Sequence, residues 1–155
     1  MAFLQDRRIA LLSVHPRYAD ALMGGQKKVE FRRRALSAET QYVIVYATAP
    51  VQKVVGWFEI AEIASDSPDR LWARFGHEGQ VAKQDFERYY ERCDEGAAIR
   101  VRKVVALKSP VTLSELDEAM AAPQSYRYVS TEILAALRGR LVSVALWRGQ
   151  EVRAR

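Results

Sequence analysis

The chain has 155 residues and a net charge of +5, from 24 lysines and arginines against 19 aspartates and glutamates. This length is typical of one domain with its own hydrophobic core, and a composition of 49% hydrophobic and 28% charged residues excludes a disordered or collagen-like chain. No run of 18 apolar residues occurs, and the single cysteine, Cys93, excludes an internal disulfide. We therefore expect one domain over residues 1–155, in the cytoplasm and without membrane association.

The excess positive charge lies in the first third of the chain. Residues 1–56 hold nine basic and four acidic side chains, whereas the remainder holds fifteen of each. Five of the nine basic side chains fall within residues 27–34. Such a concentration attracts nucleic acid, nucleotides or acidic lipid headgroups, although it also occurs on strand edges, where charge opposes aggregation. We interpret the segment as one that binds an anion.

Taken in chain order, the sequence alternates strand-like and helix-like segments. Apolar runs or alternating apolar residues predict six strands, at residues Ile9–Val14, 27–33, Tyr42–Ala47, 54–63, 97–107 and 141–147. Apolar residues at helical spacing, mostly after a proline, serine or threonine, predict helices at residues 17–23, 68–75, 81–93, from Thr112 onward and at 131–137. Because helices are inserted between strands in no regular order, we predict the α+β class, with a barrel of about six strands and helices packed around it.

The segment 27–33 combines local charge with a strand pattern. Val29 and Phe31 alternate with Lys28, Glu30 and Arg32, which predicts a strand with one buried apolar face and one exposed charged face. A carboxylate on that face can accept hydrogen bonds from a base edge or a ribose 2′-hydroxyl, and a guanidinium can hold a phosphate through two hydrogen bonds. The alternative is an exposed ion pair worth about 0–1 kcal/mol.

The common catalytic and metal-binding patterns are absent from the sequence. The two histidines, His15 and His77, lack the spacing of a metal site. We interpret His15, at a strand-to-helix corner before Pro16, as structural rather than catalytic, and Cys93 as a buried thiol on a helix. There is no phosphate-binding loop, dinucleotide fingerprint or nucleophile elbow. We expect neither a metal nor a cofactor.

Two stretches, SVHPRYADAL at 13–22 and GGQKKVEFRR at 24–33, resemble the opening signature of ASCH domains. That signature runs approximately Ser-Ile-x-Pro-x-Tyr-Ala, then a helix, then Gly-x-Lys-x-Val-Glu-x-Arg. Residues 46–56 and 96–107 are also similar to the family, and PQSYRY at 123–128 is similar to a Pro-Gln-Ser-Phe-Arg-Tyr segment of one bacterial branch. The resemblance covers nearly the whole chain.

The resemblance implies a small PUA-like β-barrel whose cleft lies between the first helix and the barrel. By position, the motif residues are Gly25, Lys27, Glu30 and Arg32, which would line the floor of that cleft. The resemblance also implies RNA binding, and some small bacterial members hydrolyse nucleic-acid-related substrates. One branch acts as an amidohydrolase on acetylated cytidine with a Lys, a Thr and a Glu. Lys27 matches that Lys, but Glu30 stands where the Thr would be, which argues against amidohydrolase chemistry.

Two lysines compete for the place beside Glu30. Strand alternation puts Lys28 on the face of Glu30, whereas the resemblance selects Lys27, which lies where the chain is still turning. We retain both as candidate ligand contacts. Lys53, which follows a proline-containing turn, is a further candidate phosphate contact.

Aromatic side chains near the end of the sequence offer a stacking surface. Tyr126 and Tyr128 can stack on an unpaired base, and they can equally pack over the barrel. We retain both interpretations.

The leading functional hypothesis is an RNA- or nucleotide-binding module with a cationic cleft for single-stranded or flipped-out nucleotides, because duplex RNA hides its base edges. The second is a metal-independent hydrolase, either a ribonuclease or a modified-nucleoside amidohydrolase, with Lys27 and Glu30 as its catalytic residues. The third is a regulatory or interaction module linked to transcription or translation, which would have a protein partner.

Overall fold

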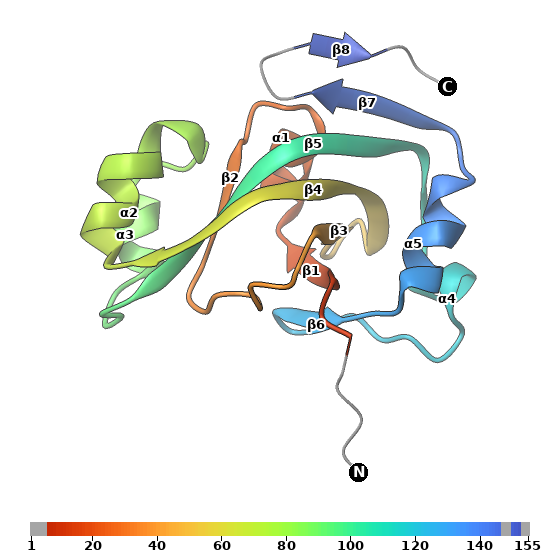
Figure 1. The fold of residues 1–155 in the computed structure, drawn as a ribbon, viewed down its shortest axis with the longest axis horizontal. Coiled ribbons are helices and arrows are strands. Elements are labelled where there is room, and N and C mark those ends of the chain that lie inside the picture. The colour runs from red at the N-terminus through yellow and green to blue at the C-terminus, as the bar shows by residue number, and fades with distance from the viewer. Residues whose placement is uncertain (1–5, 147–149, 153–155) are drawn as a thin grey trace.

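The computed structural model describes residues 6–146 and 150–152 (Figure 1). The strands are β1 (Ile9–Val14), β2 (Val29–Arg32), β3 (Tyr42–Ala47), β4 (Lys53–Asp66), β5 (Gly96–Val111), β6 (Tyr126–Tyr128), β7 (Val142–Leu146) and β8 (Gln150–Val152). The helices are α1 (Pro16–Met23), α2 (Pro68–Phe75), the 3₁₀ turn η1 (Gly76–Glu78), α3 (Lys83–Tyr89), α4 (Leu113–Leu116) and α5 (Thr131–Arg138). None of the helices in these ranges is long and apolar enough to cross a membrane.

The eight strands within the described residues belong to one curled sheet. Its order is β6-β1-β3-β4-β5-β7-β8, and β2 adds to β5 off this path. The β1–β3 pair is parallel and the other pairs are antiparallel. Register shifts between β4 and β5 bend the two longest strands. As a result, β5 pairs with β2 at residues 97–100 and with β7 at residues 103–107, which gives a half-barrel.

The helices cover different parts of this half-barrel. Figure 1 shows α2 and α3 at one end of the long strands, α4 and α5 at the other end, and α1 behind β5. Both faces of β1 are buried, because Ile9 and Leu11 pack into the core beneath α5 while Leu12 and Val14 pack into the core beneath α1. A third core joins Phe31 of β2 to α2 and α3.

The predicted α+β class is confirmed, and each of the six predicted strands is present. The two additional strands, β6 and β8, are three residues each and lack the apolar run that a sequence pattern requires. The strand expected at 141–147 is observed at Val142–Leu146, and residue 147 lies outside the described residues.

Three other boundaries differ from expectation. The strand expected at 27–33 begins only at Val29. β4 and β5 are longer than expected, because their pairing continues to Asp66–Gly96 at one end and Val54–Val111 at the other. The helix expected at 81–93 is wrong in length: it ends at Tyr89, and Arg92 has a φ of 65°, which an α-helix does not allow. Cys93 therefore lies beyond the helix, half-buried against the α2–α3 core.

The packing of α1 on the sheet is testable with one buried leucine and one exposed leucine. Leu22 of α1 is fully buried, whereas Leu141 is 67% exposed. We expect Leu22→Ala to lower the free energy of unfolding by about 2–5 kcal/mol, because it leaves a cavity under the helix, and Leu141→Ala to change it by less than about 0.5 kcal/mol. Chemical denaturation measures both values, and equal effects would contradict the placement of α1.

Candidate functional site

A cavity of about 450 Å³ opens between the end of β1, α1, β2 and α3. This volume is within the range of about 300–1,000 Å³ that is usual for small-molecule sites. Its polar lining consists of Ser13, His15, Glu30, Arg32, Arg33, Asp85 and Arg88. Its aromatic lining consists of Tyr18, Phe31, Phe86 and Tyr89. The cavity therefore combines aromatic surface with groups of both charges.

The local sequence explains how α1 and β2 frame this cavity. His15 caps α1 by accepting a hydrogen bond on Nδ1 from the backbone N–H of Arg17, at 3.2 Å, and Pro16 occupies the first helical turn. After α1, Gly25 has a φ of 84°, which favours glycine. The backbone N–H of Lys27 then donates to the carbonyl of Ala21 at 2.9 Å. This turn sends the Lys27 side chain into the protein just before β2 begins.

Lys27 lies behind the cavity and does not line it. The residue is 2% exposed, and its Nζ donates to the carbonyl of Gly79 and lies 3.6 Å from Glu30 Oε1. Nζ is also 5.0 Å from the centroid of the Tyr18 ring. Burial lowers the pKa of Lys27, and the attraction of Glu30 opposes that shift in part. Lys27 is thus a buried partner of Glu30.

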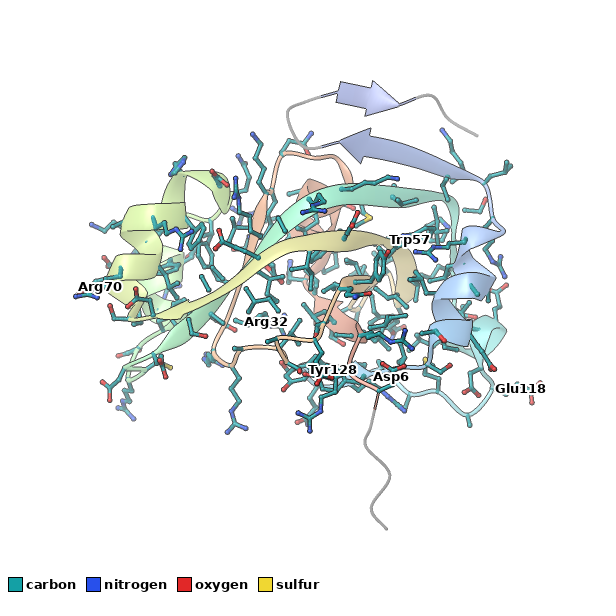
Figure 2. All side chains as sticks on the ribbon, viewed as in Figure 1. Asp6, Arg32, Trp57, Arg70, Glu118 and Tyr128 are labelled. Atoms are coloured by element: carbon teal, nitrogen blue, oxygen red, sulfur yellow. The ribbon has the colours of Figure 1, made fainter. Side chains whose placement is uncertain are left out.

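Glu30 and Arg32 lie together on the cavity floor. Arg32 Nη1 is 3.4 Å from Glu30 Oε2, so the Glu30 carboxylate lies between two cations. The Arg32 guanidinium also donates to the carbonyl of Ser13 at 3.3 Å, and to the carbonyl and hydroxyl of Ser125 at 3.2 and 2.6 Å. Figure 2 shows Arg32 beside β2, in the middle of the molecule. Arg32 therefore joins β1, β2 and the segment that leads into β6.

The expectation that the charged face of this strand is exposed is wrong. Alternation did place Glu30 and Arg32 side by side, but Glu30 is 6% exposed and the Arg32 side chain 13% exposed. The segment around Ser125 covers one side of the pair, and the Tyr90 hydroxyl ties α3 to β2 through the Arg32 carbonyl at 2.7 Å. The alternative of an exposed ion pair is contradicted by the same burial.

Lys27, rather than Lys28, is the lysine beside Glu30. β2 begins at Val29, so strand alternation does not extend back to residues 27 and 28. Lys28 is half-buried, its backbone N–H donates to the carbonyl of Glu78 at 2.8 Å, and it does not line the cavity. Gly25 contributes the turn rather than a surface of the cavity.

The structure places the other three candidates away from the cavity. Lys53 is exposed at the start of β4, and its charge adds to the Thr112 hydrogen bond in lowering the pKa of Glu115 in α4. The Tyr126 and Tyr128 rings meet edge-on at 5.7 Å and pack against the core beneath α1. The Tyr128 hydroxyl accepts a hydrogen bond from the backbone of Ser37 at 2.8 Å. Figure 2 shows Tyr128 at the β6 side of the molecule.

Several residues that line or frame the cavity were missed by the sequence reasoning. His15 was interpreted as structural, and it does cap α1, but its ring also lines the cavity. Tyr18 belongs to the 13–22 stretch, which could have identified it. Arg33 belongs to the basic run at 27–34, and Tyr89 falls within the helix expected at 81–93. Ser125, which holds Arg32, is 93 residues away in sequence, and no local signal links the two.

No group of three or more His, Cys, Asp or Glu side chains is placed to hold a metal ion within residues 6–146 and 150–152.

Comparison with known proteins identifies similar chains. The family model described as ASCH domain matches residues 12–139. An ASCH domain-containing ribonuclease from Zymomonas mobilis is 33% identical over 136 residues, which are 85% of this chain and 91% of that protein. The crystal structure of ASCH from Zymomonas mobilis matches with a TM-score of 0.76 at 29% identity, over 86% of this chain and 96% of that one. The N-terminal domain of Staphylothermus marinus McrB, at 10% identity and a TM-score of 0.55, shares the fold alone.

The buried pair of Lys27 and Glu30 is testable by a double-mutant cycle. Removing one partner of a buried ion pair leaves an uncompensated charge and costs about 3–5 kcal/mol. We expect Lys27→Met and Glu30→Gln each to lower the free energy of unfolding by about this amount. The double variant should be more stable than the sum predicts, by about 0.5–3 kcal/mol. Strict additivity would show that the two side chains do not interact.

The pH dependence of stability gives a second test of Lys27. Because burial lowers its pKa below the ordinary value of 10.5, the unfolded chain holds more protons than the folded chain between the lowered pKa and 10.5. Stability from this group therefore rises with pH across that window. We expect the free energy of unfolding of the wild type to rise relative to that of Lys27→Met as the pH approaches 10.5. A shift in the opposite direction would contradict the burial of Lys27.

Proposed function

The chain belongs to the ASCH domain family, and from this premise we propose that it is a ribonuclease that binds single-stranded RNA in the cavity, with one nucleotide over Glu30. The relative from Zymomonas mobilis, which is named a ribonuclease and aligns over most of both chains, supports this proposal. The observation that carries it is a buried carboxylate on the floor of a nucleotide-sized cavity.

The chemistry of the lining suits one unpaired nucleotide. The half-buried Tyr18 ring lines the cavity and offers aromatic surface for a base, and single-stranded RNA is bound largely by such stacking. The Glu30 carboxylate accepts hydrogen bonds only, so it suits a ribose 2′-hydroxyl. A duplex would not present its bases to a cavity of this size, because they are paired and stacked.

The proposed reaction uses this 2′-hydroxyl as the nucleophile. Glu30 takes its proton, the 2′-oxygen forms a bond to the adjacent phosphorus, and the bond from phosphorus to the 5′-oxygen of the next nucleotide breaks. The leaving 5′-oxygen takes a proton from water. The products are a 2′,3′-cyclic phosphate and a 5′-hydroxyl end.

The two cations act on Glu30 from different sides in this scheme. Lys27 lies on the Oε1 side and Arg32 on the Oε2 side, so the carboxylate is held in one orientation. Lys27 is then a positioning residue, because it does not reach the cavity. The relative that aligns over most of its length is named a ribonuclease, which favours this proposal over the other two hypotheses. The amidohydrolase and interaction-module hypotheses stay predictions.

The experiment incubates the purified chain with a short single-stranded RNA, with the same RNA as a duplex and with single-stranded DNA of the same sequence, each with and without magnesium. We expect cleavage of the single-stranded RNA alone, with cyclic phosphate ends. Glu30→Gln should slow cleavage by about 10²–10⁴-fold, because the proton acceptor is lost.

Glu39→Gln is the matched control, since it removes the same charge from an exposed position outside the cavity and should leave the rate unchanged. Circular dichroism and thermal unfolding check whether Glu30→Gln is folded. A wild type that neither binds nor cleaves single-stranded RNA in either buffer would overturn the proposal. Cleavage by folded Glu30→Gln at the wild-type rate would overturn the role of Glu30.

A further inference from the structure

Arg33 lies over the Tyr89 ring at the rim of the cavity. Its guanidinium carbon is 4.3 Å from the centroid of the Tyr89 ring, and its Nε donates to the Tyr89 carbonyl at 3.0 Å. Arg33 directly follows β2, whereas Tyr89 is the last residue of α3, so two elements fix this contact. The guanidinium is therefore held in one orientation before any ligand arrives.

The terminal nitrogens of Arg33 have no hydrogen-bond or ion-pair partner within the described residues. Arg33 is exposed, and no hydrogen bond or ion pair joins its Nη1 or Nη2 to another described residue. Arg32 is different, because both of its terminal nitrogens donate to groups of the protein. Arg33 thus presents a free, planar pair of donors toward the cavity that it lines.

The surroundings of Arg33 favour an anion. Arg88 also lines the cavity, and its side chain is 68% exposed. The two acidic side chains of the lining already have basic partners: Glu30 is paired with Lys27 and Arg32, and Asp85 is 3.7 Å from Arg88. The aromatic ring of Tyr89 supports one face of Arg33 and adds no charge. A phosphate oxygen pair matches a guanidinium fork through two parallel hydrogen bonds.

We propose that Arg33, held over the Tyr89 ring, is the binding subsite for the phosphodiester that joins the nucleotide in the cavity to its neighbour along the RNA. This inference rests on the proposed function, since it takes single-stranded RNA as the ligand. On this inference, Arg33 at the rim of the cavity provides the extra affinity for an RNA chain. The cavity floor binds a single nucleoside. The fixed guanidinium lowers the entropy lost on binding, because its side chain is already ordered.

The test measures RNA binding against salt for four proteins: the wild type, Arg33→Ala, Arg33→Lys and Arg34→Ala. Arg34 is the matched control, since it is the next residue, exposed, of the same charge and outside the cavity lining. The probe is the single-stranded RNA of the cleavage assay, titrated at low temperature in chelator, with its integrity checked on a gel. The four ribonucleosides, which carry no phosphate, report on the cavity floor.

We expect Arg33→Ala to weaken RNA binding about 10- to 100-fold at low salt, as for the loss of hydrogen bonds to a charged group. The slope of log affinity against log salt should become shallower by about 0.7, the value for one phosphate contact to a single strand. Arg33→Lys should keep the salt slope but bind more weakly than the wild type, because it lacks the planar fork. Ribonucleoside binding should be the same in all four proteins.

Two outcomes separate this inference from the function on which it rests. If the wild type does not bind the RNA at all, the proposed function and the subsite both fall. If the wild type binds the RNA, and Arg33→Ala and Arg34→Ala weaken binding equally with equal salt slopes, the subsite falls and the proposed function stands. A loss of ribonucleoside binding in Arg33→Ala would also overturn the inference, because Arg33 would then shape the floor.

Discussion

The cavity depends on one buried group of charges, formed by Lys27, Glu30 and Arg32. A carboxylate that is 6% exposed and a lysine that is 2% exposed are stable only because each has an opposite charge beside it. The group also orders its surroundings. Lys27 binds the carbonyl of Gly79 after η1, and Arg32 binds Ser13 at the end of β1 and Ser125 ahead of β6. Four separate parts of the chain therefore meet around one carboxylate.

This arrangement divides the basic residues of the first third of the chain by role. Lys27 and Arg32 are occupied by protein groups and shape the floor, whereas Arg33 at the rim keeps its terminal nitrogens available. A single stretch of sequence thus holds both buried charges that pair with protein groups and an exposed charge that is available to a ligand. The same basic stretch therefore contributes to the structure of the cavity and to its positive surface. The burial of each side chain distinguishes the two roles.

The fold was predictable from the sequence where the pattern is local. β1 has a continuous apolar run because both of its faces are buried, and the Thr112–Glu115 spacing does form a capping box. β6 was missed, since its three residues pair with β1 but carry no apolar run. The length of β5 was underestimated because its final residues follow the bend of β4 rather than any pattern of their own.

The site was predictable only in part. The family resemblance selected Lys27, Glu30 and Arg32, and the structure brings these three together, while strand alternation alone favoured Lys28. The burial of Glu30 depends on partners 52 residues beyond Lys27 and 93 residues beyond Arg32, which no local pattern encodes. Lys53, Tyr126 and Tyr128 were selected as residue types that suit RNA, but the sheet carries them away from the cavity.

We propose that RNA enters the cavity over Glu30. The most direct test of this proposal is the change in backbone amide NMR signals as single-stranded RNA is added to the labelled wild-type chain. We expect the largest changes at residues 13–18, 30–33 and 85–89, which frame the cavity. Changes centred on Lys53 or on β6, with the cavity residues unaffected, would contradict the account.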